Sequence, residues 1–543
     1  MVNSSFNFAE WPPALTDAQR THLTELATTY ALSHGLLYLP PNTDALPPPA
    51  PTSAIHAPLS LLPAPFPRHL FQNALRLQRI YNVLYARIAM DEEFLDKVMG
   101  EEVAPVDEFT GELWRSWRRL RDEGISESFH LGIFRSDYLL HAPQDSDEPV
   151  SLKQVEFNTI SSSFGALSDR ASGLHKYLFA ATNYFGASSY LKAENLPKNN
   201  ATSTVVEGLA AAHKLYGVKE AYVLFVVQPG ERNVFDQRWL EYELLERHNI
   251  HVIRQTFDEF LVSATVTPSR ILHLTPPSNP SSLSSQPIEI SVIYFRAGYT
   301  PKDYPAPAYY KLRETLSRSK AISCPTLALQ LAGGKKVQQV LTKEGVLERF
   351  LQPSSRKFGP ESFTSEDLQL LRSSWVQMFC LSDQPSISQP DGITRAKQEY
   401  QHLVLKPQRE GGGNNIYHSS VPSFLETLDE KERAAWIAMR LIEPPAGVGG
   451  YLVRAGSGTA SVNSGEGVKN ARSDVVSELG IFGWALFGGP GGQEKEILQG
   501  KIGNEDEDES RGCAWLVRTK GRESDEGGVA VGFSVLDSVL LVD

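Results

Sequence analysis

The sequence predicts a mixed α/β protein that is built from more than one domain. Between residues 221 and 296, apolar strands alternate with a helical pattern. Two long helical patterns occupy the first hundred residues, and a short apolar strand runs into a glycine-rich loop near residue 411. Alternating strands and helices are typical of a parallel sheet covered by helices. A chain of 543 residues has room for roughly two to four such domains.

Composition and charge indicate an ordinary globular protein. Hydrophobic residues make up 41% of the chain and charged residues 21%, which is typical of that class. The net charge of −12 argues against a nucleic-acid partner, because such a partner requires a basic surface. A small anionic ligand stays compatible, since a positive cleft can lie in an acidic protein.

No apolar run approaches the length of a membrane span, so we expect no membrane partner. The first residues show neither a secretory nor a mitochondrial leader. The three cysteines are too few and too scattered for a disulfide framework or a zinc site. A reducing compartment fits this usage, and the cytoplasm is the expected location.

The N-terminal part is expected to be helical. Thr16 and Gln19 form a capping-box pattern, and apolar residues follow at helical spacing until Gly35 ends the helix. A proline-rich stretch over residues 40–51 predicts an extended connection. Leu70 to Leu84 form a second amphipathic helical pattern whose stripe predicts a core face.

The middle of the chain predicts a parallel α/β unit. Strands are expected over residues 221–227, 250–253 and 288–295, with a helix over 235–248. Together they indicate a doubly wound domain over residues 219–325. The Ser- and Pro-rich residues 275–287 and the acidic run 505–509 are expected to be solvated surface segments. Neither is given a function.

The glycine-rich loop is the stretch around which the chain is organised. Leu403 to Leu405 form a short apolar strand that leads into residues 406–417. Gly411 to Gly413 leave backbone N–H groups open to an anion, Lys406 and Arg409 add positive charge, and Glu410 offers a hard oxygen suited to Mg²⁺. This pattern indicates a triphosphate clamp, although a solvated hairpin loop explains the same residues. It is not a Walker P-loop, whose spacing is absent.

A second group of polar residues lies on a predicted strand. The alternation over residues 154–159 places Gln154, Glu156 and Asn158 on one face. A carboxylate and an amide two residues apart can both bind one Mg²⁺ ion. A polar edge strand followed by a turn at Ser161 is the alternative.

Cations at strand and helix ends complete the pattern. Arg135, Arg296 and Arg518 follow or lie on apolar strands and suit bidentate binding of carboxylates or phosphates. Lys335 and Lys520 are suited to phosphates. Each would also fit a surface ion pair. No Ser-His-Asp or Cys-His pattern is visible, so the set favours phosphoryl transfer by positioning and electrostatics rather than covalent catalysis.

Several motifs resemble eukaryotic glutathione synthetase in order and spacing. They cover residues 134–138 (Phe-Arg-Ser-Asp-Tyr), 156–161 (Glu-Phe-Asn-Thr-Ile-Ser), 231–238, 294–299, 330–339, 406–417, 477–483 and 518–530. The resemblance runs from about residue 130 to the C-terminus, whereas the first hundred residues resemble the family only in helical character.

This resemblance implies an ATP-grasp fold with a parallel α/β substrate-binding domain, a helical N-terminal part and a glycine-rich lid. The implied domains are residues 1–218, with the helical part and the first segment of the ATP-grasp body, 219–325, the substrate-binding domain, and 326–543, the body and lid. A homodimer is expected. The implied enzyme joins γ-glutamylcysteine to glycine with ATP and Mg²⁺, through an acyl phosphate, and releases glutathione, ADP and phosphate.

The site residues are carried over by motif. Catalytic roles are implied for Arg135, Lys335, Lys406 and Arg518, and Mg²⁺ binding for Glu156, Asn158 and Glu410. The implied ATP site consists of Glu156, Lys335, Lys406, Pro407, Gln408, Arg409, Glu410, Gly411, Gly412, Gly413, Asn414, Asn415, Tyr417, Met439, Arg440, Leu441, Ile442, Glu478, Lys520 and Glu526. The implied peptide site consists of Arg135, Ile160, Ser161, Ser162, Ser163, Glu231, Arg232, Asn233, Gln237, Arg296, Ala297, Gly298, Tyr299, Arg518, Val529 and Ala530.

Three positions depart from the family pattern. Arg440 and Leu441 stand where the family often has Glu and Lys, but an adenine hinge binds mainly through its backbone. Glu526 is one methylene longer than the common Asp, and Ala297 replaces a frequent acidic residue, so we assign it no side-chain role. Two other functions would share part of the pattern, namely another ATP-grasp carboxylate–amine ligase and a nucleotide-binding regulator without catalysis.

Overall fold

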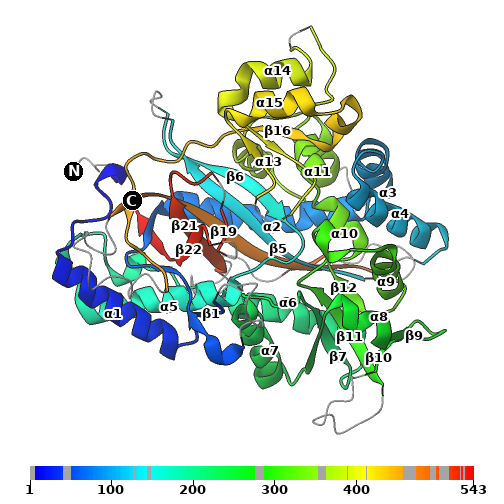
Figure 1. Ribbon diagram of the computed structural model, residues 1–543, viewed down its shortest axis with the longest axis horizontal. Coiled ribbons are helices and arrows are strands. Elements are labelled where there is room, and N and C mark those ends of the chain that lie inside the picture. Colours follow the sequence, from blue (N-terminus) through cyan, green and yellow to red (C-terminus); the bar gives the residue numbers. More distant parts are fainter. Residues whose placement is uncertain are drawn as a thin grey trace.

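The computed structural model describes residues 6–543 except 41–49, 126–128, 144–147, 276–286, 353–361, 388, 411–412, 456–471, 490–496, 500–512, 526 and 530–531. One large mixed sheet lies at the centre, and helices cover it (Figure 1). The mixed α/β class expected from the sequence is confirmed. Most of the proline-rich stretch, most of the Ser- and Pro-rich segment and all of the acidic run 505–509 lie outside the described residues.

The N-terminal helices follow the expected signals. The helix α1 (Asp17–Ser33) begins with the predicted capping box, in which the amide of Gln19 donates to Thr16 Oγ1 at 3.2 Å and the amide of Thr16 donates to Gln19 Oε1 at 2.9 Å. The helix α2 (Arg68–Ala89) is longer than its apolar stripe and is buried over most of its surface. It packs against the central sheet and a neighbouring helix, so even Asn82 and Arg87 are buried.

The central sheet carries the strands that matter for function. Antiparallel neighbours in it are β6 (Ser151–Asn158), β5 (Phe129–His141), β19 (Ser473–Gly488), β21 (Trp515–Gly521) and β22 (Ser534–Asp537). The strands β5 and β19 are long and pair over most of β5, from Phe129 to Tyr138. Side chains on one face of this antiparallel array therefore have a broad, rigid support.

The predicted parallel α/β unit is present. It contains β7 (Tyr222–Val226), α7 (Val234–His248), β8 (Val252–Gln255), β11 (Ile288–Phe295) and β12 (Ile322–Cys324). Parallel pairing joins β8, β7, β11 and β12 in that order. The strand β8 begins two residues later than expected, because Val252 is the first residue that pairs with β7. The strand β12 also pairs with β5, so the sheet is continuous, and the three domain boundaries stay a prediction.

A smaller antiparallel sheet forms a separate layer, which is yellow in Figure 1 and which we call the lid sheet. Its order is β13 (Met378–Cys380), β16 (Ile437–Arg440), β14 (Leu403–Lys406) and β15 (Ile416–Tyr417). The helices α14 (Gly392–Glu399) and α15 (Ser420–Thr427) cover it over a small core of its own. The predicted apolar strand before the glycine-rich loop is thus β14.

The other described helices connect and cover these sheets. They are α3 (Glu92–Leu95), α4 (Glu108–Asp122), α5 (Gly165–Thr182), α6 (Ala201–Tyr216), α8 (Phe257–Ser263), α9 (Pro307–Ser317), α10 (Leu327–Ala332), α11 (Lys335–Leu341), α12 (Val346–Leu351) and α13 (Ser365–Ser373). The other described strands are β1 (Leu37–Tyr38), β2 (Ile55–His56), β3 (Leu59–Ser60), β4 (Ala64–Pro67), β9 (Ala264–Val266), β10 (Leu272–Leu274), β17 (Gly449–Gly450), β18 (Leu452–Val453), β20 (Leu498–Gln499) and β23 (Val539–Val542). None of the helices in the described part of the chain has the length and apolar character of a membrane span.

Candidate functional site

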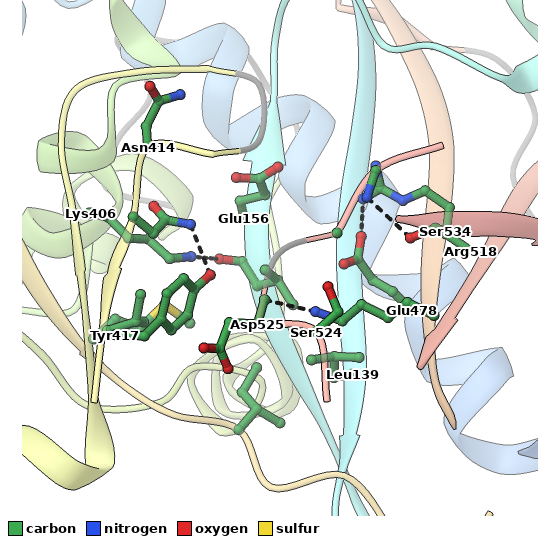
Figure 2. Close-up of a pocket in the computed structure, with 18 of the residues that line it drawn as sticks. Leu139, Glu156, Lys406, Asn414, Tyr417, Glu478, Arg518, Ser524, Asp525 and Ser534 are labelled. Atoms are coloured by element: carbon green, nitrogen blue, oxygen red, sulfur yellow. Dashed lines mark hydrogen bonds and ion pairs between the residues drawn. The ribbon is translucent and has the colours of Figure 1, made fainter. Parts of the chain in front are cut away.

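A cavity of about 1010 Å³ is lined by residues of both the central sheet and the lid sheet. Figure 2 shows Lys406, Asn414 and Tyr417 on one side of Glu156, and Glu478 with Arg518 on the other. The residues of the sequence-derived site that line the cavity are Arg135, Glu156, Asn158, Ile160, Ser161, Ser163, Tyr299, Lys406, Arg409, Glu410, Asn414, Asn415, Tyr417, Met439, Arg440, Leu441, Ile442, Glu478, Arg518, Lys520 and Val529.

The remaining residues of that site are placed in three ways. Lys335 contacts two carboxylates of the lining. Ser162, Glu231, Arg232, Asn233, Gln237, Arg296, Ala297, Gly298, Pro407, Gln408 and Gly413 are described but are not part of the lining. Gly411, Gly412, Glu526 and Ala530 lie outside the described residues.

Two carboxylates from distant parts of the chain meet at one lysine. Lys335, at the start of α11, lies 3.0 Å from Glu156 Oε2 and 3.1 Å from Glu410 Oε1. Glu156 comes from β6, whereas Glu410 comes from the glycine-rich loop. Burial would lower the pKa of Lys335, but the two carboxylates outweigh it and raise the pKa above its ordinary value. The ammonium therefore stays charged.

The two carboxylates differ in how well they are compensated. Burial would raise the pKa of Glu156, but Lys335 and Lys406 outweigh it and hold the pKa well below its usual range. For Glu410, burial is the largest effect and raises the pKa to about 7, while Lys335 opposes the shift and the nearby Glu156 adds to it. Glu156 is thus well compensated, whereas Glu410 is compensated only in part, and a further cation beside Glu410 would favour its charged form.

Lys406 is the second cation at this point. It ends β14, and its ammonium donates to the carbonyl of Val155 at 2.9 Å. Burial lowers its pKa to about 8, and the neighbouring Lys335 acts in the same direction. A lysine in this setting gains most from an anionic ligand, because such a ligand compensates the desolvated charge.

The expectation that Gln154, Glu156 and Asn158 share one face of a strand is wrong for Gln154. The pairing of β5 with β6 shifts by one residue: Glu156 pairs with Asp137 and Gln154 with Tyr138, so Val155 has no partner. Such a bulge turns the residues before it to the other face. Accordingly, Gln154 Nε2 donates a hydrogen bond to Ser136 Oγ at 2.7 Å, and Gln154 Oε1 accepts one from Trp375 Nε1 at 3.2 Å.

Asp137 is a central residue that the sequence reasoning did not assign. Its carboxylate accepts from Arg135 Nε at 2.6 Å, from Asn158 Nδ2 at 3.0 Å and from Arg518 at 3.1 Å. Arg518 also pairs with Glu478 on the adjacent strand β19. The available signal was the spacing of Arg135 and Asp137, because residues two apart on a strand share a face.

Burial and pairing set the charges of this group as well. Burial raises the pKa of Glu478, and Arg518 opposes that shift. For Arg518, burial acts downward, but Glu478 and Asp137 outweigh it and raise the pKa. Two arginines thus share one buried aspartate, and each keeps further N–H donors for an anionic ligand.

A second cluster surrounds Arg296 beside the cavity. Arg296 is buried and donates to the carbonyl of Ser162 at 3.1 Å and to Ser163 Oγ at 2.6 Å. Asp236, which the sequence reasoning also left unassigned, accepts from the amides of Phe164 and Ala166 at 2.8 and 2.9 Å. Asp236 therefore anchors the turn that presents the serines at the start of α5.

Glu231 and its neighbours form the outer part of this cluster. Glu231 accepts from the amide of Asn233 and from Gln237 Nε2, each at 3.2 Å. Tyr299, which lines the cavity, donates to Gln228 at 3.4 Å. Arg232 instead lies with its guanidinium 4.8 Å from the ring centre of Tyr38.

The base of the glycine-rich loop is tied to the body of the protein. Gln408 accepts from the amide of Lys336 and donates to the carbonyl of Ala435, each at 3.0 Å. Arg409 pairs with Asp107, which caps the N-terminus of α4. These contacts hold Gln408 and Arg409, the two residues before Glu410, without using Glu410 itself.

A substitution at Gly480 tests how tightly the arginine–aspartate group is packed. Gly480 pairs with Asp137, and a methyl group there would lie 2.8 Å from both Arg135 Cδ and Asp137 Oδ1. Because small displacements of positioning groups weaken their action on a ligand, Gly480→Ala is expected to lower the affinity of the cavity for an anionic ligand by ~10-fold or more. Gly521→Ala on β21 is the matched control, since a methyl group there meets nothing within 4 Å. Equal affinity of the two variants for such a ligand would contradict the tight packing of this group.

Comparison with known proteins identifies relatives over nearly the whole chain. The family model described as "Eukaryotic glutathione synthase, ATP binding domain" matches residues 17–541. Glutathione synthetase of Dictyostelium discoideum is 34% identical over 96% of this chain and 98% of its own length. Glutathione synthetase of Homo sapiens is 34% identical over 97% of this chain and 98% of its own length. The large chain of the Schizosaccharomyces pombe enzyme is 33% identical over the same shares.

A solved structure shows the same fold. A glutathione synthetase-like effector from Globodera pallida aligns with a TM-score of 0.69 and 22% identity, over 97% of this chain and 98% of that one. At this identity, the likeness carries the fold alone. The mixed sheet, the lid sheet and the cavity that they line are thus the ATP-grasp architecture expected above.

Proposed function

This chain belongs to the eukaryotic glutathione synthase family, and from that membership we propose that its cavity joins γ-glutamylcysteine to glycine at the expense of ATP. The class of activity follows from the family: the chain is an ATP-dependent ligase that forms glutathione. The identity of the dipeptide, the residue roles, the metal ion and the assembly are parts of the proposal.

The donor set fits Mg²⁺. Glu156, Glu410 and Asn158 line one cavity and offer hard oxygen donors, and a cation beside Glu410 would favour its charged form, which burial disfavours. Among the described residues, no group of three or more His, Cys, Asp and Glu side chains could hold a metal ion. The protein would then supply only part of the ligand shell, as is usual for Mg²⁺ bound together with phosphates. Bound there, the ion would neutralise charge on the transferred phosphoryl group.

The charges of the cavity suit the first step of ligation. The cysteine carboxylate of γ-glutamylcysteine attacks the γ-phosphorus of ATP, which forms an acyl phosphate and releases ADP. Lys335 and Lys406 would hold the phosphates, and Arg135 and Arg518 would hold the dipeptide carboxylates in line. The amine of glycine then attacks the acyl carbon, loses a proton and expels phosphate.

The observation that carries the proposal is the meeting of Glu156 and Glu410 at Lys335. It joins the strand β6, the helix α11 and the glycine-rich loop in a carboxylate pair that shares Lys335 and has Lys406 as a second neighbouring cation. The direct experiment measures phosphate release from ATP and Mg²⁺ with γ-glutamylcysteine, with and without glycine. Release that requires both substrates, together with formation of glutathione, is expected. Rapid release with glycine but without the dipeptide would contradict the proposal.

The acceptor is expected to be glycine rather than β-alanine. Val529 is buried and lines the cavity together with Gly527 and Gly528, and we expect these residues to fit closely around the acceptor. One extra methylene changes selectivity by about 1–3 kcal/mol, so kcat/KM for β-alanine should be at least ~10-fold lower. Steady-state assays with both amines at fixed ATP and dipeptide measure this ratio. Equal or better use of β-alanine would overturn the acceptor assignment alone.

The assembly and location complete the proposal. We expect a homodimer, and exposed apolar residues on α1, α5 and α7 (Leu32, Tyr177, Tyr242 and Leu245) support a protein–protein contact on that face. A cytoplasmic location is supported by Cys324, Cys380 and Cys513, which are all buried and form no disulfide bond within the described part of the chain.

A further inference from the structure

The segment after β16 crosses from the lid sheet to the central sheet and forms one wall of the cavity. Residues 441–444 line the cavity directly after Met439 and Arg440, and we call residues 441–445 the crossover segment. On the lid side, the amide of Leu441 donates to the carbonyl of His402 at 2.8 Å. On the other side, the amide of Ala142 donates to the carbonyl of Glu443, also at 2.8 Å. The wall is therefore held from both sheets.

His141 supplies a further contact to the same residue. The amide of Glu443 donates to Nδ1 of His141 at 3.0 Å. His141 is the last residue of β5, two residues beyond Leu139, which lines the cavity. The imidazole itself is half-buried and is not part of the lining. It acts on the backbone of the wall and not on a ligand.

The contact depends on the protonation state of the imidazole. Nδ1 can accept only while the ring is neutral, with its proton on Nε2. The other contacts described for the crossover segment use backbone carbonyls and amides and the guanidinium of Arg522, none of which titrates near neutral pH. His141 is thus the one titratable support among these described contacts.

The surroundings of His141 favour the neutral ring. Burial lowers its pKa below the ordinary value; Glu443 on the crossover segment and Glu148 before β6 oppose this, while Lys153 on β6 and Arg440 at the end of β16 act with it. The ring is consequently neutral at and above pH 7 and becomes charged as the pH falls. The contact to Glu443 is then present at high pH and lost at low pH.

We propose that His141 is a positioning residue for ATP, whose neutral imidazole holds the crossover segment in the conformation that binds the nucleotide. The proposal rests on the proposed ATP site at residues 439–442 and adds a residue behind it. Protonation of His141 removes the acceptor for the Glu443 amide, and this wall of the cavity loses one of its supports. Acid should therefore weaken ATP binding more than dipeptide binding.

Two variants separate the acceptor from the shape of the side chain. His141→Asn keeps an oxygen near the position of Nδ1 but does not titrate, and His141→Phe keeps a ring without an acceptor. The exposed His22 on α1 provides the control His22→Asn. ATP affinity is measured by calorimetry with Mg²⁺ at pH 8.0 and pH 5.5, and KM for the dipeptide is measured at pH 8.0. Titration of ATP itself is common to all variants and cancels in the comparison.

The expected result is a specific loss of ATP affinity. At pH 8.0, His141→Phe should bind ATP about fivefold more weakly, the equivalent of one neutral hydrogen bond, while His141→Asn and the control bind it normally. Between pH 8.0 and 5.5, the wild type and the control should lose more affinity than His141→Asn, by up to about fivefold when the imidazole is fully protonated. The KM for the dipeptide should change less than about twofold, because the proposed dipeptide residues Arg135 and Arg518 lie on β5 and β21 and not on the crossover segment.

Equal pH dependence of the wild type and His141→Asn would overturn the proposal, and this comparison stands even if His141→Phe fails to fold. A rise of the dipeptide KM in His141→Phe equal to its loss of ATP affinity would indicate a merely structural role and would also overturn it. Because ATP affinity is measured by binding, the comparison of the wild type with His141→Asn does not depend on ligation. Normal ATP binding without glutathione formation would instead contradict the proposed function.

Discussion

Glu410→Gln is expected to lower turnover by at least ~10²-fold while the protein stays folded. The substitution keeps the size of the side chain and removes the charge that faces Lys335 at 3.1 Å. In the proposed reaction, that charge binds Mg²⁺ during phosphoryl transfer, so the loss should appear in kcat and in the Mg²⁺ requirement. The measurement is ADP formation at saturating substrates over a range of Mg²⁺ concentrations.

Glu410→Gln should lower turnover without lowering thermal stability. Since burial raises the pKa of Glu410 to about 7, the charged form is disfavoured in the folded protein without a metal ion. A raised pKa means that stability falls as the pH rises from the ordinary value of a glutamate towards 7. Glu410→Gln should therefore unfold at an equal or higher temperature than the wild type at pH 8.

The control for both measurements is Glu426→Gln, at an exposed position on α15. Turnover of Glu410→Gln within about threefold of this control would contradict the metal assignment.

Arg518→Met is expected to damage both activity and stability. Arg518 contacts Asp137 at 3.1 Å and pairs with Glu478, and all three side chains are largely buried. Breaking a buried ion pair by removing one partner typically costs about 3–5 kcal/mol, so the free energy of unfolding should fall by an amount near that range. The kcat/KM for the dipeptide should fall at least ~30-fold, since a buried charged contact to the ligand is also lost.

A second substitution distinguishes these two effects. Adding Glu478→Gln to Arg518→Met removes one uncompensated carboxylate, and we expect it to restore part of the lost stability but not the activity. Urea unfolding of the two single variants, the double variant and the wild type gives the coupling energy. A coupling energy near zero would show that Arg518 and Glu478 do not stabilise each other. Arg518→Lys should be intermediate, because lysine cannot contact both carboxylates with one planar group.

Much of the fold and of the site was predictable because the residues concerned occur in local motifs. The capping box at Thr16, the strand before Lys406 and the helix that starts at Lys335 each depend on neighbours within a few positions. The same holds for the parallel α/β unit, because the periodicity of its apolar residues predicts its strands and its helix. The carried-over residues at 135, 156, 406, 410, 478 and 518 all line one cavity, although their individual roles stay predictions.

What the sequence by itself determined is therefore the set of local elements and the family to which they belong, since helix caps, strand periodicity and motif spacing are properties of short segments. Only the tertiary structure decided which way the side chains point and which groups compensate their charges. The bulge at Val155 turns Gln154 away from Glu156, and Asp137 becomes the shared partner of Arg135 and Arg518. The pKa of Glu410 is raised because the side chain is buried where β6, α11 and the glycine-rich loop meet. Strand register, burial and ion pairing arise between segments far apart in the chain, and no local pattern encodes them.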